Sequence, residues 1–356
     1  MTMRAIVFHG ARDVRVEEVP EPDGALRADE VLIAPRCCGI CGTDLHEYAA
    51  GPIVIPSEPH PLTGARLPQI LGHELSADVL AVGREVTVTR VGDRVSVMPL
   101  LSCGRCHFCR RGLRHLCVAM GCVGLSWAWG GMAPLAVVRE QNVAVLPDRL
   151  TYEQGALIEP AAVAAWSAAR AGVRAGDAVM VTGAGPIGCL AVLAALAAGA
   201  GQVFAAEPNP HRRALALSLG CAAVFDPTAT DVAAEGRERT GGVGADVCLE
   251  CAGTGAALRA CLDACRPDGT VSQTGLHTRP AEIDAFELSH REVTLTGTWC
   301  YPVQEWPRMF AQVASGRFPV ERIVTGEVAI ADAVHAGFDA LLDPAGTEVK
   351  ILVRTA

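Results

Sequence analysis

The chain has 356 residues, of which 50% are hydrophobic and 19% charged, and these values are typical of a soluble globular protein with about two domains. Its net charge of −9 argues against a general nucleic-acid-binding protein, because neutralising phosphates requires clustered lysine and arginine. The only lysine is Lys350, which argues against Schiff-base chemistry and Walker-type phosphate binding.

The N-terminal stretch MTMRAIVFHGARDVRVEE has no apolar signal segment before its charges resume. A cytoplasmic location is therefore predicted, where the 15 cysteines are expected to be reduced. Reduced cysteines at this density indicate metal binding, catalysis or core packing rather than a disulfide framework.

Residues 1 to about 150 contain short strand-like runs separated by glycine and proline, such as RAIVF, EVLIAP and DRVSVMP. This pattern predicts a β-rich barrel or sandwich. Within it, the segment CCGICGTDLH holds Cys37, Cys38 and Cys41. Spacing alone does not say which of them has a chemical role, since an isolated cysteine is more often a small core residue than a ligand.

Farther along, the segment CGRCHFCRRGLRHLC spaces four cysteines as Cys-x2-Cys-x2-Cys-x7-Cys, namely Cys103, Cys106, Cys109 and Cys117. Four thiolates at such short spacings can close a tetrahedral zinc site with no open position. An iron–sulfur cluster uses similar spacings, but no second cluster motif or following proline is present. The segment therefore predicts a structural zinc site, and catalysis must lie elsewhere.

From about residue 160, strands alternate with helices of about ten residues, which predicts a parallel sheet with helices on both faces. The stretch 178–206 carries no charge and would fit a membrane-spanning window. Its glycines divide it into strand, turn, helix and strand, so we expect a buried α/β segment and no membrane contact.

A dinucleotide-binding motif lies at the start of this region. In VTGAGPIG, Gly183, Gly185 and Gly188 have Gly-x-Gly-x-x-Gly spacing, and Pro186 and Ile187 open the following helix. The glycines allow a tight turn, close approach of a pyrophosphate and close packing of helix on strand. The helix N-terminus offers free N–H groups to the phosphates. Alone the motif is weak, because a plain strand-to-helix turn can have the same spacing.

Glu207 strengthens this prediction. It ends the next predicted strand, where an acidic side chain can accept hydrogen bonds from an adenosine ribose. The same carboxylate repels a 2′-phosphate, so NAD is favoured over NADP. Arg212 and Arg213 follow closely and could soften that preference.

Together with LGHE at 71–74 and IEP at 158–160, these motifs occur in an order that resembles the zinc-containing medium-chain alcohol dehydrogenases over nearly the whole chain. The segment GICGTDLHEYAAGPIVIPSEPHPLTGARLPQILGHE is similar to the 2,3-butanediol dehydrogenases, a branch close to sorbitol and other polyol dehydrogenases. The resemblance implies a GroES-like β-rich catalytic domain, residues 1–157 completed by 296–356. It also implies a Rossmann domain with a doubly wound parallel sheet, residues 158–295.

The resemblance further implies two zinc ions per chain, with a catalytic one between the domains. Cys41 and His73 match ligand positions, while Glu74 and Glu159 are both candidates for the carboxylate ligand. Which glutamate binds directly stays open. One thiolate, one imidazole and one carboxylate would leave zinc an open fourth position for a substrate oxygen.

Two further residues take roles from the resemblance. Thr43 would accept the substrate proton, and a relay through the cofactor ribose would pass it to His46. A homodimer or homotetramer is also implied, joined through the sheet edge near VTLTGTW at 293–299.

The sequence therefore predicts an NAD- and zinc-dependent oxidoreductase for small secondary alcohols, in particular vicinal diols or hydroxyketones such as 2,3-butanediol and acetoin. The alternative is a polyol, cyclitol or amino-alcohol dehydrogenase, because Trp127 and Trp129 replace a commonly glycine-rich stretch and bulky indoles could reshape the substrate cleft. A non-enzymatic nucleotide-binding thiol sensor is disfavoured, because every expected zinc ligand is present.

Overall fold

The computed structural model describes residues 1–355, which form two compact units. The first comprises Met1–Glu159, Pro302–Ala314 and the chain from Val324 onward, and the second comprises Pro160–Tyr301 and Ser315–Ile323. The predicted return to the first domain at residue 296 is too early, because β16 (Thr294–Gly297) pairs with the sheet of the second unit. Ser315–Ile323 also leaves the first unit, since its helical turn at Val320–Ile323 packs against α4 (Pro186–Ala197).

The first unit is built mainly from strands. Its strands are β1 (Thr2–Gly10), β2 (Asp13–Pro20), β3 (Glu30–Gly39), β4 (Gln69–Ile70), β5 (Glu74–Val82), β6 (Arg94–Val97), β7 (Leu100–Leu101), β8 (Gly121–Cys122), β9 (Ala136–Arg139), β10 (Val143–Val145), β17 (Val324–Ala329) and β18 (Lys350–Arg354). The largest sheet has the order β10-β6-β5-β3-β18-β17, with β9 also paired to β3. The predicted GroES-like β-rich domain is confirmed.

The helical segments of this unit are short except for α3, within which the boundary between the two units falls. They are α1 (Gly42–Ala50), α2 (His107–Arg110), α3 (Tyr152–Arg170), α9 (Trp306–Ala314), a π-helical segment Ala333–Asp339 and α10 (Ala340–Leu342). Aliphatic residues of the strands, including Ile33, Leu75 and Val97, form one core cluster with Phe338 of the C-terminal segment.

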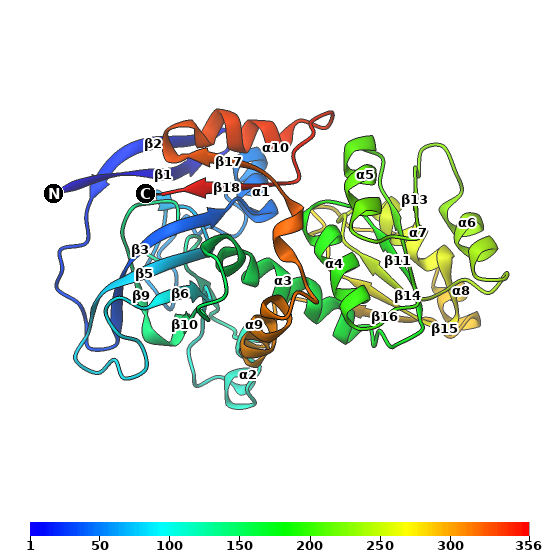
Figure 1. The fold of residues 1–356 in the computed structure, drawn as a ribbon, viewed down its shortest axis with the longest axis horizontal. Coiled ribbons are helices and arrows are strands. Elements are labelled where there is room, and N and C mark those ends of the chain that lie inside the picture. Colours follow the sequence, from blue (N-terminus) through cyan, green and yellow to red (C-terminus); the bar gives the residue numbers. More distant parts are fainter. Residues whose placement is uncertain (356) are drawn as a thin grey trace. The chain divides into compact units, whose positions relative to one another are not determined.

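Strand β3 sets the register around the future site. Gly39 at its end pairs with Glu74 of β5 on one side and with Leu352 of β18 on the other. Figure 1 shows β18, in red, lying beside the blue β3. Residues from three distant parts of the sequence therefore meet at the end of β3.

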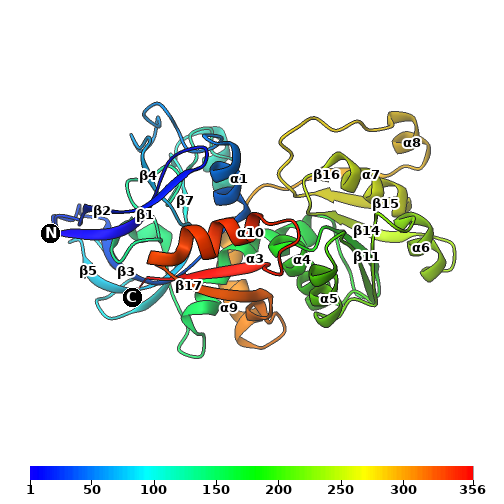
Figure 2. The same ribbon diagram turned by 90° about the horizontal axis from the view of Figure 1, so that it is seen from above.

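The second unit contains a six-stranded sheet of order β13-β12-β11-β14-β15-β16 in which every pairing is parallel. Its other strands are β11 (Ala178–Thr182), β12 (Gln202–Ala206), β13 (Ala223–Phe225), β14 (Ala245–Glu250) and β15 (Cys265–Gln273), several of them side by side in Figure 2. Its other helices are α5 (Pro210–Ser218), α6 (Val232–Arg239), α7 (Gly255–Ala264) and α8 (Ala285–His290). The predicted Rossmann sheet is confirmed, and its strand order reverses between β11 and β14.

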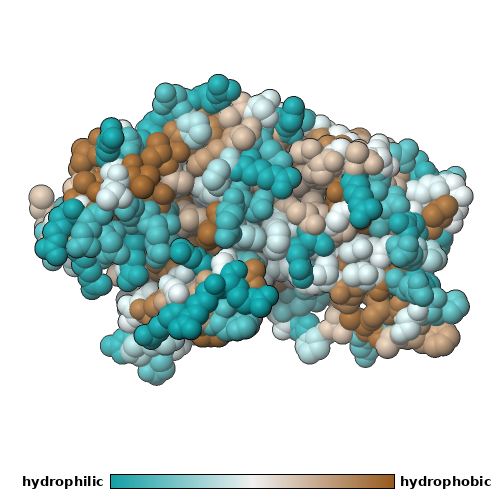
Figure 3. Space-filling model, turned by 90° about the horizontal axis from the view of Figure 1, so that it is seen from below, coloured by the Kyte–Doolittle hydropathy of each residue, from teal (hydrophilic) through white to brown (hydrophobic). Residues whose placement is uncertain are grey.

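The charge-free stretch 178–206 is the centre of this unit. It consists of β11, α4 and β12, and the middle of α4 from Gly188 to Ala195 is buried. Among residues 1–355, no helix is both long and apolar enough to cross a membrane. The face drawn in Figure 3 carries hydrophilic residues beside several patches of hydrophobic ones.

Candidate active site and metal centres

Helix α1 organises the first cluster of functional side chains. Cys41 is its N-cap residue, and the Cys41 backbone N–H donates to Oδ2 of Asp44 at 2.9 Å. An acidic side chain at this position also compensates the positive end of the helix dipole. This hydrogen bond fixes Cys41 at the N-terminal end of α1.

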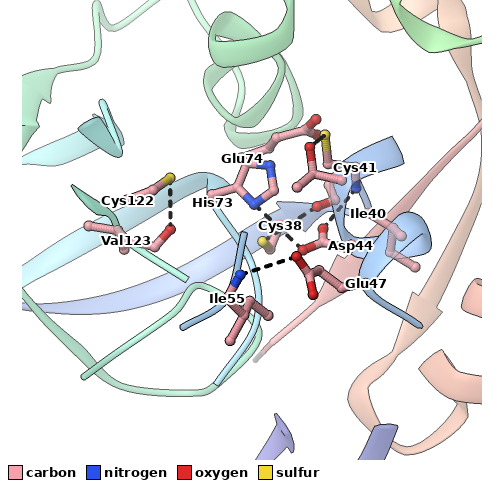
Figure 4. Close-up of polar contacts among 12 residues, drawn as sticks. Cys38, Ile40, Cys41, Asp44, Glu47, Ile55, His73, Glu74, Cys122 and Val123 are labelled. Atoms are coloured by element: carbon pink, nitrogen blue, oxygen red, sulfur yellow. Dashed lines mark hydrogen bonds and ion pairs between the residues drawn. The ribbon is translucent and has the colours of Figure 1, made fainter. Parts of the chain in front are cut away.

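Cys41, His73 and Glu74 bring one potential ligand atom each to within 4.8 Å of one another. His73 and Glu74 are 5% and 1% exposed and Cys41 is partly buried, so most of this cluster is screened from solvent. Ligands that share one zinc at about 2.0–2.3 Å lie within about 4.6 Å of one another. The three donors, drawn in Figure 4, therefore have the spacing and chemistry of a zinc site.

The electrostatics of this cluster also fit a cation. Burial, followed by the Glu74 charge, raises the pKa of the Cys41 thiol, and burial raises the pKa of Asp44. Burial alone lowers the pKa of His73, but Asp44, Cys41 and Glu159 together raise it well above its ordinary value. A divalent cation among these groups would stabilise their anionic forms and the neutral imidazole.

Asp44 faces the metal-binding histidine candidate. Its Oδ1 lies 3.5 Å from Nδ1 of His73, and neither of these buried atoms has a hydrogen-bond partner in the described chain. Metal-bound histidines commonly direct their other ring nitrogen toward a carboxylate. Asp44 is therefore placed to orient His73, a role that no sequence motif indicates.

Glu159 lies on α3 and is 7% exposed. Its charge acts on His73, which puts it in the neighbourhood of the cluster. Within residues 1–355, however, the set of mutually close ligand atoms contains Glu74 and not Glu159.

The four-cysteine segment forms a second cluster, well separated in sequence from the first. The Sγ atoms of Cys103, Cys106, Cys109 and Cys117 lie within 4.8 Å of one another. Backbone N–H groups point at the sulfurs, including Cys103 N–H to Cys117 Sγ at 3.3 Å and Ala119 N–H to the same sulfur at 3.4 Å. The N–H groups of Cys109 and Val118 lower the pKa of Cys106 to about 6. A thiolate is thus stabilised in advance, as a tetrahedral zinc site requires.

The glycine motif of the second unit has the geometry that a dinucleotide needs. Gly183 has a φ of 87°, and a Cβ at Gly188 would lie 1.8 Å from the carbonyl oxygen of Gly183. Gly185 precedes α4, has nothing near the position of a Cβ, and is followed by Pro186 and Ile187 in the first turn of the helix. Open space at Gly185 and free N–H groups at the helix start suit a phosphate group.

Glu207 closes this loop from the end of β12. Its two carboxylate oxygens accept the N–H groups of Ala184 at 2.7 Å and Asn209 at 2.9 Å, and the residue is 5% exposed. Arg213 is occupied by an ion pair with Asp226 at 3.0 Å. Nε of Arg212 is buried and has no hydrogen-bond partner among residues 1–355.

The chain is similar to known proteins over almost its whole length. Residues 27–148 match the alcohol dehydrogenase GroES-like domain, and residues 186–315 match the zinc-binding dehydrogenase domain. (R,R)-butanediol dehydrogenase of Bacillus subtilis (strain 168) is 39% identical over 354 residues, 99% of each chain. The chain belongs to the zinc-dependent alcohol dehydrogenase family. Members of this family act on CH–OH groups with NAD(P) as the cofactor.

Two further similarities agree with this assignment to the alcohol dehydrogenase family. The crystal structure of 2R,3R-butanediol dehydrogenase from Bacillus subtilis matches it with a TM-score of 0.92 and 37% identity, covering 99% of this chain and 100% of that chain. Sorbitol dehydrogenase of Bacillus subtilis (strain 168) is 33% identical over 332 residues, 92% of this chain and 90% of the relative. The predicted family, fold class and enzyme class are confirmed, and the non-enzymatic alternative is not supported.

Lys350 also lies at the cluster of Cys41, His73 and Glu74, although no sequence motif predicts it there. Nζ of Lys350, which is 0% exposed, forms an ion pair with Oε2 of Glu74 and donates to the carbonyl oxygen of Ile40 at 2.9 Å. Gly39 makes room for this pair, because a Cβ there would lie 2.2 Å from Oε2 of Glu74. The available signal was compositional: Lys350 is the only lysine in a chain whose other basic residues are arginine.

The two residues of the predicted proton relay lie on the same helix. Oγ1 of Thr43 is 3.8 Å from Sγ of Cys41, and His46 follows one turn later. Burial lowers the pKa of His46, which is half-buried, and the Glu47 charge opposes this shift. The imidazole therefore stays neutral, and able to accept a proton, at lower pH than an ordinary histidine.

The two indoles that were predicted to be able to reshape the substrate cleft both pack against the core of the first unit. Trp127 is 6% exposed and belongs to the core cluster of the first unit, where its Nε1 donates to the carbonyl oxygen of Val137 at 2.7 Å. Trp129 is partly buried and packs against the same cluster. Trp127 therefore contributes to the packing of the first unit.

Proposed function

We propose that this dehydrogenase oxidises small secondary alcohols with NAD, most favourably a vicinal diol such as 2,3-butanediol, and reduces the corresponding hydroxyketone in reverse. The observation that carries the proposal is the cluster of Cys41, His73 and Glu74 in a chain 39% identical to (R,R)-butanediol dehydrogenase. A polyol substrate is the second candidate, supported by the 33% identity to sorbitol dehydrogenase.

Two zinc ions are proposed per chain. Cys41 and His73 would hold the catalytic ion together with a carboxylate of Glu74 or Glu159, and the four cysteines of the segment 103–117 would hold the structural one. The ion pair with Lys350 leaves Oε1 of Glu74 available as a ligand atom, since Lys350 contacts Oε2. When bound, zinc would acidify the substrate hydroxyl and the nicotinamide would accept the hydride.

The chain's own residues would manage position and protons. Asp44 orients the His73 imidazole through Nδ1. Thr43 Oγ1, close to Cys41, would accept the proton of the substrate hydroxyl, and His46, one helical turn farther along α1, would deliver the relayed proton to solvent. Burial of His73 and Glu74 excludes water from the inner side of the site.

The preference for NAD is proposed from Glu207. Its carboxylate, already fixed by Ala184 and Asn209, retains lone pairs for the ribose hydroxyls and repels a 2′-phosphate. Arg212, whose Nε lacks a partner, would lie near the adenosine side of the cofactor. A homodimer or homotetramer joined at the β16 edge of the sheet and a cytoplasmic location complete the proposal.

The test is initial-rate kinetics of the zinc-replete enzyme with 2,3-butanediol, sorbitol, an inositol, threonine and ethanol, with NAD and NADP compared at equal concentration. We expect the highest kcat/KM with 2,3-butanediol and NAD. A rate with 2,3-butanediol no higher than with ethanol contradicts the diol assignment, and a preference for sorbitol favours the second candidate.

A further inference from the structure

Glu250, the last residue of β14, is a buried carboxylate to which the proposed function gives no role. Its side chain is 0% exposed, and it lies at the carboxyl end of the strand, in register with Thr182 of β11. A buried carboxylate is costly unless hydrogen-bond donors surround it. The partners of Glu250 therefore indicate what it holds in place.

Glu250 connects the loop after β14 with the loop after β15, the neighbouring strand in Figure 2. Its Oε1 accepts the N–H groups of Ala252 at 2.9 Å and Gly253 at 2.7 Å. Its main-chain carbonyl oxygen accepts the N–H groups of Thr274 at 2.9 Å and Gly275 at 3.0 Å. One residue thus ties together the first turns of both loops.

His277 joins the second loop to the same carboxylate. Its Nε2 lies 3.3 Å from Oε2 of Glu250, and the imidazole is the donor because a carboxylate only accepts. Gly275 leaves room for this contact, since a Cβ there would lie 2.8 Å from Oε2. Hydrogen bonds to an ionised group are among the stronger ones in proteins. The imidazole therefore fixes the second loop to the end of β14.

The loop after β14 lies against the glycine motif. A Cβ at Gly183 would lie 2.9 Å from Cβ of Ala252, and the N–H of Cys251 donates to the carbonyl oxygen of Thr182 at 2.9 Å. The strand order reverses between β11 and β14, and a dinucleotide binds across the crevice at such a point. Glu250 and the loops that it ties therefore border the proposed cofactor site.

The two sides of this crevice serve different halves of a dinucleotide. The glycine motif and Glu207 follow β11 and β12, on the side proposed to hold the pyrophosphate and the adenosine. The loops tied by Glu250 follow β14 and β15, in the half of the sheet that receives the second nucleotide. His277 also borders a cavity of about 520 Å³, lined in part by Gln273 and Gly297, the last residues of β15 and β16.

We propose that Glu250 and His277 are a pair of positioning residues that fix the loops after β14 and β15 in the arrangement that receives the nicotinamide of the cofactor. This rests on the proposed use of NAD. The pair acts through the loops and takes no part in hydride or proton transfer. Its loss should therefore weaken binding of the nicotinamide and spare binding of the ADP part.

The first experiment separates the two parts of the cofactor. Calorimetric titration gives the Kd of NADH and of ADP-ribose, which lacks the nicotinamide, for the zinc-replete wild type, His277→Ala and His277→Gln. In His277→Ala the Kd of NADH is expected to rise about 5- to 20-fold, while that of ADP-ribose stays within about two-fold. His277→Gln keeps an N–H donor and should restore most of the affinity for NADH.

His290→Ala is the matched control, because His290 is an exposed histidine of the same unit, at the end of α8. It should change neither Kd. An unchanged Kd of NADH in His277→Ala overturns the proposal, and so does an equal loss of affinity for ADP-ribose.

The second experiment tests the loops without cofactor. Hydrogen exchange of the amides of Thr274 and Gly275 is compared in the wild type and His277→Ala. Exchange is expected to accelerate at least about 5-fold, with the zinc content unchanged. Unchanged exchange combined with weaker binding of NADH would mean that the imidazole contacts the cofactor itself, and the positioning role would be wrong.

These outcomes do not depend on the alcohol. If the wild type binds NADH and does not oxidise 2,3-butanediol, the diol assignment is wrong and the comparison of NADH with ADP-ribose still decides the role of the pair. If the wild type prefers NADPH, the role of Glu207 is wrong. NADPH carries the same nicotinamide, so His277→Ala should lose affinity for it by the same factor.

Discussion

The two proposed metal sites of this dehydrogenase are assembled from the sequence in different ways. The thiols of Cys103, Cys106, Cys109 and Cys117 come from one short segment, and backbone N–H groups of the same segment support them. Cys41 is the N-cap of α1, His73 and Glu74 lie directly before and at the start of β5, and the partner of Glu74 is Lys350, 276 positions away. The four-cysteine site depends only on the fold of its own segment. The cluster of Cys41, His73 and Glu74, here called the open site, depends on the register of β3, β5 and β18.

The difference has a chemical reason. Four thiolates would complete the coordination of zinc, so the proposed local site would be closed and structural. The proposed catalytic site would keep an open position for substrate, and the charges of Asp44 and Lys350 lie beside its candidate ligands. Substitutions should therefore act on catalysis in one region and on stability in the other.

The largest expected effect is that of Cys41→Ala. We expect it to remove one zinc ion per chain and to lower kcat/KM at least about 10³-fold, because the open site loses its thiolate. Metal analysis and initial rates are the measurements. Cys37→Ala, at a fully buried cysteine of β3, is the control and should retain both zinc ions and most activity. Equal losses from both variants would contradict the distinction between ligand and core cysteine.

Lys350→Met should have the second-largest effect, on stability. It leaves Glu74 buried without its cation, and breaking a buried pair typically costs about 3–5 kcal/mol of folding free energy. Denaturant unfolding would measure this loss, and zinc analysis should find the four-cysteine site still loaded. The double variant with Glu74→Gln should recover part of the stability. A double variant as unstable as the sum of both single variants would show that the pair is not coupled.

Cys106→Ser should lower stability and leave catalysis nearly unchanged, the reverse of what is expected for Cys41→Ala. Loss of one thiolate should empty the four-cysteine site and lower Tm by at least about 5 °C, because metal binding there contributes to folding. Below the new Tm, kcat per loaded catalytic site should stay within about two-fold of the wild type. Calorimetry and active-site titration measure the two effects, and loss of activity with an unchanged Tm would contradict a purely structural role.

The smallest effect is expected for His46→Gln. A relay residue at the surface can be bypassed by water, so kcat should fall by less than the ~10²-fold that a general base commonly supplies. Because burial lowers the pKa of His46, the unfolded chain binds the proton more readily, and His46 reduces stability as pH falls below its unfolded pKa of about 6.5. Unfolding free energies at pH 5 and pH 8 should therefore differ less in the variant, and an unchanged difference would argue against the lowered pKa.

Much of the fold followed from local patterns. Strand and helix periodicities predicted the β-rich and Rossmann parts. Short spacings predicted the four-cysteine cluster and the glycine loop, because each of these sites is formed by one short continuous segment of the chain. The C-terminal return was placed too early at residue 296, because nothing local distinguishes β16 as the last strand of the parallel sheet.

The sequence by itself determined the family, the two-part architecture and which residue types were available for chemistry, because these depend on motif order and short spacing. Only the tertiary structure decided which charges accompany the open site. It paired Lys350 with Glu74, set Asp44 against His73, moved Trp127 into the core and brought His277 to Glu250. Such contacts depend on strand register and side-chain direction across the fold, and a linear sequence does not contain them explicitly.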